Sequence, residues 1–186
     1  MESVECIICG ENNSNHLISV PDRLNPQNKE IFNIVKCICG FIYLNPRPNI
    51  SDIKFYYKSN EYDPHIRNKD SFYDKVYLFV QKLSFYRKRK IINRLISSPG
   101  TLLDIGGGNG DFCSYMKSYG WKTILQDNSE TSLDIAKSKG IKTINTLDEI
   151  NDIKSIDVIT LWHSLEHIHN IHQLLNTIKG KLKEGK

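Results

Sequence analysis

The residues whose types and spacing most clearly suggest chemistry lie between Leu102 and Phe112, in the stretch LLDIGGGNGDF. Its apolar start is typical of a parallel-sheet strand, because such strands are covered on both faces. Four glycines follow it: Gly106, Gly107, Gly108 and Gly110. They allow backbone N–H groups to approach a ligand closely, and Asp111 is placed to cap the next helix. The stretch predicts a nucleotide-type cradle, with a plain turn as the structural alternative.

Two acidic residues lie where such a cradle would use them. Asp127 follows Gly106 by 21 positions, the spacing at which a carboxylate accepts hydrogen bonds from both ribose hydroxyls of an adenosine. A cap of the following helix is its alternative role. Asp104 precedes the glycines, where a carboxylate holds the loop backbone or meets a cationic group of a ligand.

The glycine spacing separates two kinds of nucleotide ligand. The dinucleotide fingerprint is G-x-G-x-x-G, but here Asp111 occupies the third glycine position and Gly110 comes one residue early. An acidic residue at the start of a helix repels a pyrophosphate, since that end of the helix otherwise attracts anions. The pattern therefore favours an adenosine ligand without phosphates over NAD.

Four of the five cysteines form two pairs near the N-terminus: Cys6 and Cys9, then Cys37 and Cys39. Two such pairs can supply four thiolates to one tetrahedral zinc ion, with the glycine after each pair permitting a tight turn. The second pair is C-x-C, one residue shorter than the common spacing. Buried free thiols are one alternative, and replacement of one cysteine by His16 is another.

Histidines gather after a predicted strand, in the sequence HSLEH from His163 to His167. The pattern matches the metalloprotease motif H-x-x-E-H, but that motif needs both histidines on one helix face, whereas His163 directly follows a strand. We expect this segment to line a substrate mouth instead, where a histidine with a pKa near neutrality takes up a proton. His169 and His172 lie nearby without a spacing typical of a metal site.

Composition narrows the class of protein. The 186 residues are 39% hydrophobic and 25% charged, as in ordinary globular proteins, and the formal charge of +4 disfavours nucleic acid as a partner. The basic run Arg87 to Lys90 is typical of a solvated helix face. With no signal peptide, no bilayer-spanning stretch and an odd number of cysteines, the sequence predicts a cytoplasmic protein without disulfides or a membrane partner.

The elements that must position these groups follow from periodicity. Apolar residues at helical spacing predict one long amphipathic helix, or two, over residues 71–96. After the glycines, strands and helices alternate: a helix over 112–119, a strand over 121–127, a helix over 129–139, a strand over 141–145, a strand over 156–162 and a helix over 171–182. This alternation predicts an α/β fold with a parallel sheet, whose ligands bind beyond the carboxyl ends of the strands.

Three segments are expected. Residues 1–48 form a zinc-ribbon-like module with strands in HLISVPD and EIFNIVKC, closed by FIYLNPRP. Residues 49–100 form a helical linker and the N-terminal helices of the catalytic domain, with a short helix from Ile50 to about Tyr57. Tyr56, Tyr57 and Tyr62 are expected to pack onto the domain or overhang a pocket. Residues 101–186 form a Rossmann-like domain.

Taken together, LLDIGGGNGDF, QDNS and IDVITLWHSLEHIHN resemble class I S-adenosylmethionine-dependent methyltransferases. The N-terminal cysteines and YLNPRP are similar to those of the subgroup with a cysteine-rich zinc module. The resemblance implies that the cofactor is held by Asp104, Gly106, Gly107, Gly108, Gly110, Asp127, Asn128 and His163. It also implies a structural zinc ion and a small-molecule acceptor such as a sugar. His167, or His163, is the candidate catalytic base.

The family sheet has seven strands, and the sequence LKEGK at the end of this chain resembles the turn that leads into the fifth. We therefore expect a methyltransferase fold that is truncated before strand five, with weak cofactor binding and impaired turnover. Two alternatives stay open: a non-catalytic zinc-ribbon binding module on a degenerate Rossmann scaffold, and an NAD-dependent oxidoreductase. The sequence does not indicate the oligomeric state.

Overall fold

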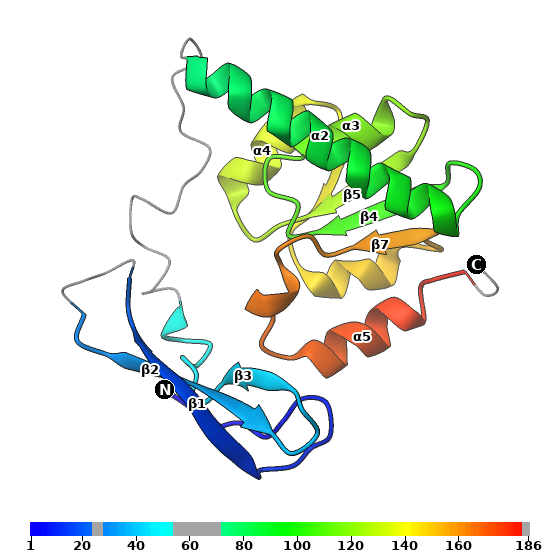
Figure 1. Cartoon of the computed structure of the whole chain (residues 1–186). Helices are drawn as coiled ribbons and strands as arrows, with labels where there is room; N and C mark the ends of the chain where they lie inside the picture. Colours follow the sequence, from blue (N-terminus) through cyan, green and yellow to red (C-terminus); the bar gives the residue numbers. More distant parts are fainter. Residues whose placement is uncertain (24–27, 54–71, 184–186) are drawn as a thin grey trace. The chain divides into compact units, whose positions relative to one another are not determined.

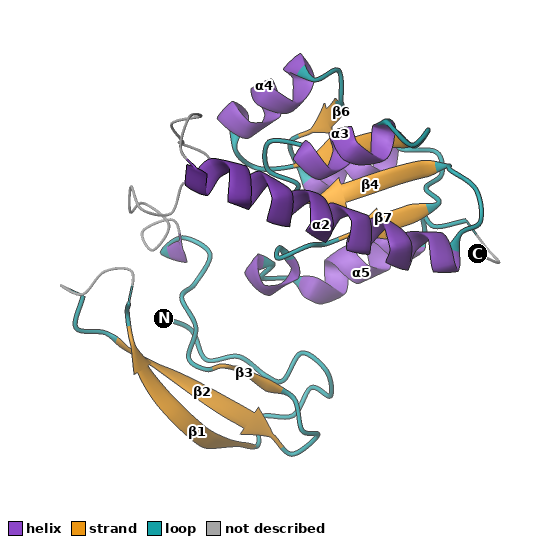
Figure 2. Cartoon of the chain, turned by 45° about the horizontal axis from the view of Figure 1, so that its top comes forward, coloured by secondary structure: helices purple, strands orange, loops and turns teal. Residues whose placement is uncertain are grey.

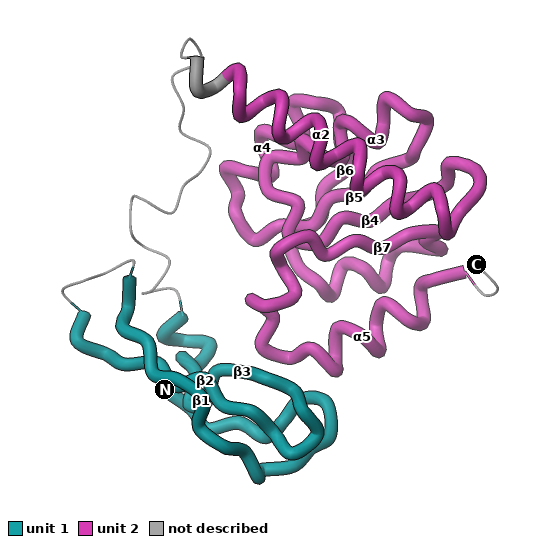
Figure 3. Tube along the Cα trace, in the orientation of Figure 1, with its two compact units in different colours: residues 1–66 teal, residues 67–186 magenta. Residues whose placement is uncertain are grey.

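The computed structural model describes residues 1–23, 28–53 and 72–183, and the side chains of residues 72–74 are not described. The chain divides into two compact units, residues 1–66 and residues 67–186 (Figure 3). Most of the short helix predicted from Ile50, together with Tyr56, Tyr57 and Tyr62, lies outside the described residues. Each unit is considered by itself below.

The first unit is an antiparallel three-stranded sheet in the order β1-β2-β3 (Figure 1). Strands β1 (Ser14–Pro21) and β2 (Ile31–Cys37) correspond to the two predicted strands. The segment expected only to close the module contains β3 (Ile42–Leu44), which pairs with β2 because its residues still donate to a ladder before the prolines begin. The buried apolar residues of this unit are Cys6, Val35 and Cys37, so its apolar core is small for the part of the chain that is described.

The second unit contains a four-stranded sheet in the order β6-β5-β4-β7, parallel throughout (Figure 3). The predicted parallel α/β sheet is therefore confirmed. Its strands are β4 (Thr101–Ile105), β5 (Lys122–Gln126), β6 (Lys142–Ile144) and β7 (Val158–Thr160). The strand predicted over 156–162 is shorter than expected, because a turn begins at Trp162 and Ile156 forms only an isolated bridge with Leu182.

Helices cover both faces of this sheet (Figures 1 and 2). On one face lie α2 (Phe72–Leu95), α3 (Asp111–Lys117) and α4 (Glu130–Ser138). On the other lie the 3₁₀ helix η2 (Leu147–Asp152) and α5 (Ile171–Lys179). The residues predicted as one helix or two form the single helix α2. Within the described ranges, none of the helices combines the length and the apolar character that crossing a membrane requires.

Two apolar cores fix the edge of the sheet where a site is expected. Successive residues of β4 point to opposite faces, so Leu102 packs with α2 and α3 whereas Leu103 packs with η2 and α5. Both side chains are completely buried. Because β4 is held from both sides, the glycine loop that follows it begins at a fixed position.

Candidate functional site

The glycine loop is locked against the segment that follows β7. Gly106 has a φ of +68°, and a Cβ added there would lie 2.5 Å from the Cβ of Ser164. The Ser164 hydroxyl donates to the carbonyl oxygen of Ile105 at 2.7 Å. Only glycine combines this left-handed backbone with so close an approach. The loop after β4 and the segment after β7 therefore form one rigid edge.

The N–H groups of the loop are directed into the protein. Those of Gly106 and Gly107 donate to the carbonyl oxygen of Gln126 at 2.8 and 3.2 Å, and that of Gly108 donates to the Asp127 carboxylate at 2.9 Å. The expectation that these N–H groups face a ligand is therefore wrong for these three. A phosphate cradle needs free donors, so the arrangement disfavours a phosphate-bearing ligand at this loop.

The start of α3 also differs from the prediction. The residue that caps the helix is Gly110, with a φ of +74° and no side-chain hydrogen bond, whereas Asp111 is the first helical residue. The Asp111 carboxylate accepts from the Lys139 ammonium at 2.5 Å, and this ammonium also donates to the carbonyl oxygen of Asn109 at 2.7 Å. Lys139 balances the charge of Asp111, so repulsion by Asp111 is not what disfavours a pyrophosphate. A pyrophosphate is disfavoured because the loop N–H groups already donate hydrogen bonds within the protein.

The carboxylate of Asp127 joins two loops and keeps part of its hydrogen-bonding capacity. One oxygen accepts from the Gly108 N–H and the other from the Ser129 N–H, both at 2.9 Å. The cap of α4 is Ser129, whose hydroxyl accepts from the Ser132 N–H. A carboxylate offers about four lone-pair positions, so two remain for the two hydroxyls of a ribose. The neighbouring Asn128 is exposed at the same edge.

Asp104 is a buried carboxylate at the end of β4. Its side chain is 3% exposed and accepts a hydrogen bond from the Thr160 hydroxyl at 2.6 Å. Burial raises the pKa of Asp104 to about 6, although the Thr160 bond and the positive charge of Lys88 act in the opposite direction. At neutral pH the group is therefore mainly ionised and retains the capacity to interact with a cation.

This raised pKa gives a testable pH dependence. At about pH 3 the carboxyl is mostly protonated in the folded and the unfolded chain alike. As the pH rises from about 3 to about 7, the unfolded chain loses this proton first, and the folded state is destabilised by about 3 kcal/mol. Urea unfolding of the wild type and of Asp104→Asn across this range should show the variant gaining that amount relative to the wild type. Parallel profiles would contradict the assignment.

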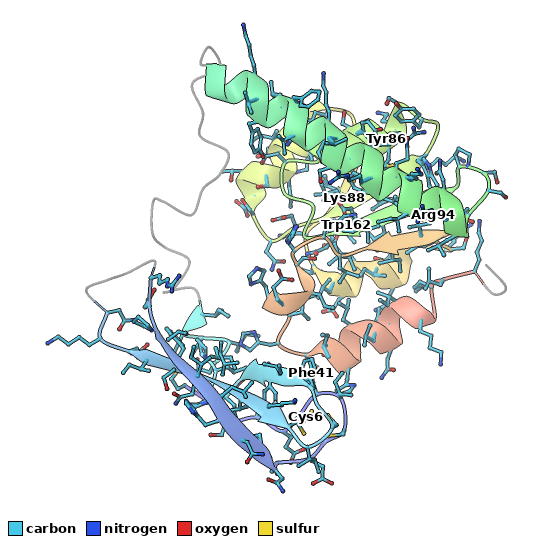
Figure 4. All side chains as sticks on the ribbon, viewed as in Figure 1. Cys6, Phe41, Tyr86, Lys88, Arg94 and Trp162 are labelled. Atoms are coloured by element: carbon cyan, nitrogen blue, oxygen red, sulfur yellow. The ribbon has the colours of Figure 1, made fainter. Side chains whose placement is uncertain are left out.

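Lys88 faces the candidate site, although the basic run Arg87 to Lys90 is typical of a solvated helix face. Its ammonium lies 4.8 Å from the ring centroid of Trp162 (Figure 4). It also lies 5.4 Å from the ring centroid of Phe112. Burial lowers the pKa of Lys88, and the negative charge of Asp104 raises it. The sequence did contain a signal: Lys88 follows the apolar Phe85 by three residues and so lies on the same face of α2.

The indole N–H of Trp162 is a further hydrogen-bond donor at the candidate site. The Trp162 ring packs edge-on against Phe112, with 6.2 Å between the centroids. The indole N–H is buried and has no hydrogen-bond partner within the described ranges. Buried indole N–H groups usually have a partner, and a ligand beside Lys88 could supply one. The observation fits a site built for a polar molecule.

Of the two histidines in HSLEH, one lies in a turn and the other in a 3₁₀ helix. His163 is exposed and left-handed, with a φ of 59°, whereas His167 is exposed at the end of the 3₁₀ helix η3 (Leu165–His167). Between them, the buried Ser164 holds the chain against the glycine loop. These histidines form no metal-binding group with Glu166 in the part of the chain that is described, so the geometry does not fit a metalloprotease.

In the first unit, each cysteine pair lies in a turn that is closed by the glycine following the pair. The Gly10 N–H donates to the Cys6 carbonyl oxygen at 2.8 Å, and the Gly40 N–H donates to the Cys37 carbonyl oxygen at 2.9 Å. Both glycines are left-handed. The shorter spacing of the second pair is therefore accommodated by a tighter turn.

The four thiols meet at one point, where all their sulfur atoms lie within 4.8 Å of one another. Cys6 Sγ lies 3.6 Å from Cys39 Sγ. Cys9 Sγ lies 3.5 Å from Cys37 Sγ. Tetrahedral coordination with Zn–S bonds of about 2.3 Å needs sulfur atoms about 3.8 Å apart, so the residues fit a zinc ion. His16 lies outside this group.

The fold and the site together define a Rossmann-like α/β domain with polar and charged groups at the carboxyl edge of its sheet. Residues 80–186 match the methyltransferase domain family. This match takes in more than half of the 186 residues, so the chain belongs to that family. The resemblance to class I methyltransferases is confirmed.

Two relatives and one solved structure are similar to this chain over part of its length. A ubiquinone biosynthesis O-methyltransferase of Rickettsia felis is 29% identical over 89 residues, which cover 44% of this chain and 36% of that enzyme. Its counterpart in Rickettsia conorii is 33% identical over 87 residues, which cover 42% of this chain and 30% of that enzyme. The matched stretch thus spans about a third of these relatives. The structure of a SAM-dependent methyltransferase from Archaeoglobus fulgidus shows 24% identity and a TM-score of 0.47, covering 61% of this chain and 54% of that one.

Proposed function

We propose that the protein transfers a methyl group from S-adenosylmethionine to a small-molecule acceptor. The observation that carries this proposal is the buried carboxylate of Asp104 within electrostatic range of the Lys88 ammonium, which itself lies over the ring of Trp162. The indole N–H of Trp162 has no hydrogen-bond partner among the described residues. When bound, S-adenosylmethionine supplies an electrophilic methyl group on a sulfonium. The protein's own residues then have to bind, orient and shield the two reactants.

At the adenosine end, the two lone-pair positions left on Asp127 would accept the two ribose hydroxyls. The glycine loop would lie against the sugar, since the N–H groups of Gly106, Gly107 and Gly108 are already bonded inside the protein. The exposed Asn128 would contact the same end. A nucleoside without phosphates matches these groups better than a dinucleotide does.

At the methionine end, the ligand carries an ammonium and a carboxylate. The buried carboxylate of Asp104 suits the ammonium, and Lys88 suits the carboxylate, with the Trp162 N–H as a further donor. Opposite charges placed together in a half-buried site interact more strongly than in water, because the surroundings are less polar. This end of the site would therefore select a zwitterion.

On the acceptor side, we propose His167 as the base that takes a proton from the acceptor, with His163 as the alternative. Both are exposed on the segment after β7, next to the locked loop. An imidazole nitrogen can accept a proton from a hydroxyl and is suited to this role. The Rickettsia relatives are named for O-methylation in ubiquinone biosynthesis, and a hydroxyl on a sugar or another metabolite is the acceptor we propose here.

For the first unit we propose a structural zinc ion held by the four thiolates of Cys6, Cys9, Cys37 and Cys39. The small apolar core of this unit supports that role, because the metal would supply stability that burial does not. Reduced thiols also suit a cytoplasmic location. We retain residues 1–48 as the zinc module, 49–100 as the linker with N-terminal helices, and 101–186 as the cofactor domain.

Titration calorimetry tests the cofactor proposal. Wild-type protein should bind S-adenosylhomocysteine and S-adenosylmethionine, whereas Lys88→Met should bind both roughly tenfold to a hundredfold more weakly, because a charged hydrogen bond is worth about 1.5–3 kcal/mol. Lys90→Met, on the same helix but exposed, is the matched control and should bind as the wild type does. Preferential binding of NAD would indicate an oxidoreductase. If none of these nucleosides binds, the result would support the alternative of a non-catalytic zinc-ribbon binding module and would contradict the methyltransferase proposal.

A further inference from the structure

Helix α2 carries a row of exposed apolar side chains on the face opposite Lys88. They recur at helical spacing: Val76, Phe79, Val80 and Leu83. Their exposed fractions are 46, 69, 54 and 40%. Single exposed apolar residues are common, but a contiguous apolar row of this kind marks an interaction surface. The first turns of α2 extend past the sheet in two views (Figures 1 and 2).

The same face continues with basic residues toward the end of the helix. Arg87, Lys90 and Arg94 follow Leu83 at intervals of four, three and four residues, and all three are exposed. Residues 75–95 contain seven lysines and arginines and no acidic residue. One face of one helix thus presents an apolar half followed by a positively charged half.

The order of the apolar and the basic half distinguishes two possible partners, a second copy of this chain and an anionic lipid bilayer. In a parallel pair with a second copy, the basic half would face the identical basic half and repel it. In a full antiparallel pair, the basic half would face Val76 to Leu83, where it finds no counter-charge. An anionic bilayer offers an apolar interior and a negatively charged surface side by side, and so complements both halves at once.

We propose that α2 docks the protein on an anionic lipid surface, lying in the plane of the membrane. The apolar row would enter the boundary between headgroups and acyl chains, and Arg87, Lys90 and Arg94 would contact lipid phosphates. This proposal departs from the prediction of no membrane partner. That prediction depended on the absence of a bilayer-spanning stretch, whereas this helix would lie on the membrane surface. Because Lys88 contacts Trp162 from the opposite face, docking would bring the candidate site within about one helix diameter, about 10 Å, of the lipid.

Vesicle flotation with the full chain tests this proposal. The wild type should float with phosphatidylcholine vesicles that contain phosphatidylglycerol, and should stay behind with phosphatidylcholine alone. Phe79→Glu should lower partitioning at least about tenfold, and so should Arg87→Glu combined with Lys90→Glu, because both the apolar and the charged contacts are needed. All these side chains are exposed, so the variants should keep the wild-type circular dichroism.

Matched controls use the same chemical changes elsewhere on the second unit. Leu175→Glu on α5, and Lys122→Glu combined with Lys142→Glu at the amino ends of two strands, should float as the wild type does. The proposal is overturned by the absence of binding to anionic vesicles, or by a Phe79→Glu variant that binds unchanged. It is also overturned if sedimentation shows a dimer that Phe79→Glu separates, which would make a second copy the partner.

Discussion

Replacing Asp127 by alanine is expected to weaken binding of S-adenosylhomocysteine about 100-fold or more. In the proposed complex this carboxylate accepts both ribose hydroxyls while it also holds the Gly108 and Ser129 N–H groups. Each hydrogen bond to a charged group contributes about 1.5–3 kcal/mol, so loss of two of them accounts for the expected change. Titration calorimetry gives the dissociation constants directly.

Two further variants separate binding from folding. Asp134→Ala removes an exposed carboxylate from α4, where it pairs with Lys137, and should leave the affinity unchanged. Asp127→Asn keeps one carbonyl oxygen as an acceptor and should fall between the wild type and Asp127→Ala. An Asp127→Ala protein that folds and binds as the wild type does would show that Asp127 only joins the two loops.

Replacing Cys6 by serine is expected to abolish zinc binding and unfold the first unit. Structural zinc sites contribute about 10–16 kcal/mol of binding free energy that is available only to the folded module. The four sulfur atoms lie within 4.8 Å of one another, so removal of one thiolate leaves three ligands and an open position. Zinc content by atomic absorption should fall from one equivalent to none, with faster tryptic cleavage of the N-terminal region.

Cys113→Ala is the matched control for this experiment. Cys113 is completely buried in the core of the second unit, far along the chain from the cluster. Its replacement should reduce stability modestly, because a small cavity forms, and should leave the zinc content at one equivalent. A wild-type protein that is metal-free and yet well folded in its first unit would exclude the zinc proposal.

Local pattern accounts for most of the fold. The apolar run ending at Ile105, the glycines after it and the helical spacing over residues 71–96 each depend on neighbours in sequence, and the structure contains a strand, a loop and a helix there. The sequence predicted the ends of the elements less accurately. For example, Asp111 was expected to cap α3, but the cap is Gly110. Such ends depend on which group reaches the first free N–H groups, and nearby sequence does not settle that.

The candidate site depended more on tertiary contacts. The sequence singled out Asp104 and Asp127 by their positions at strand ends, but it did not find Lys88, whose role follows from its approach to Trp162 across 74 positions of the chain. The direction of the loop N–H groups was likewise invisible, because their acceptors lie on β5 and in Asp127.

The sequence by itself determined the class of protein, the parallel sheet and the residue types available for binding, because periodicity and glycine spacing are local properties of the chain. Only the tertiary structure decided which groups meet. It brought the short C-x-C pair to the first cysteine pair, turned the loop donors inward, and brought Lys88 within electrostatic range of the buried Asp104 carboxylate. Those outcomes depend on distances between residues far apart in the chain, which packing alone fixes.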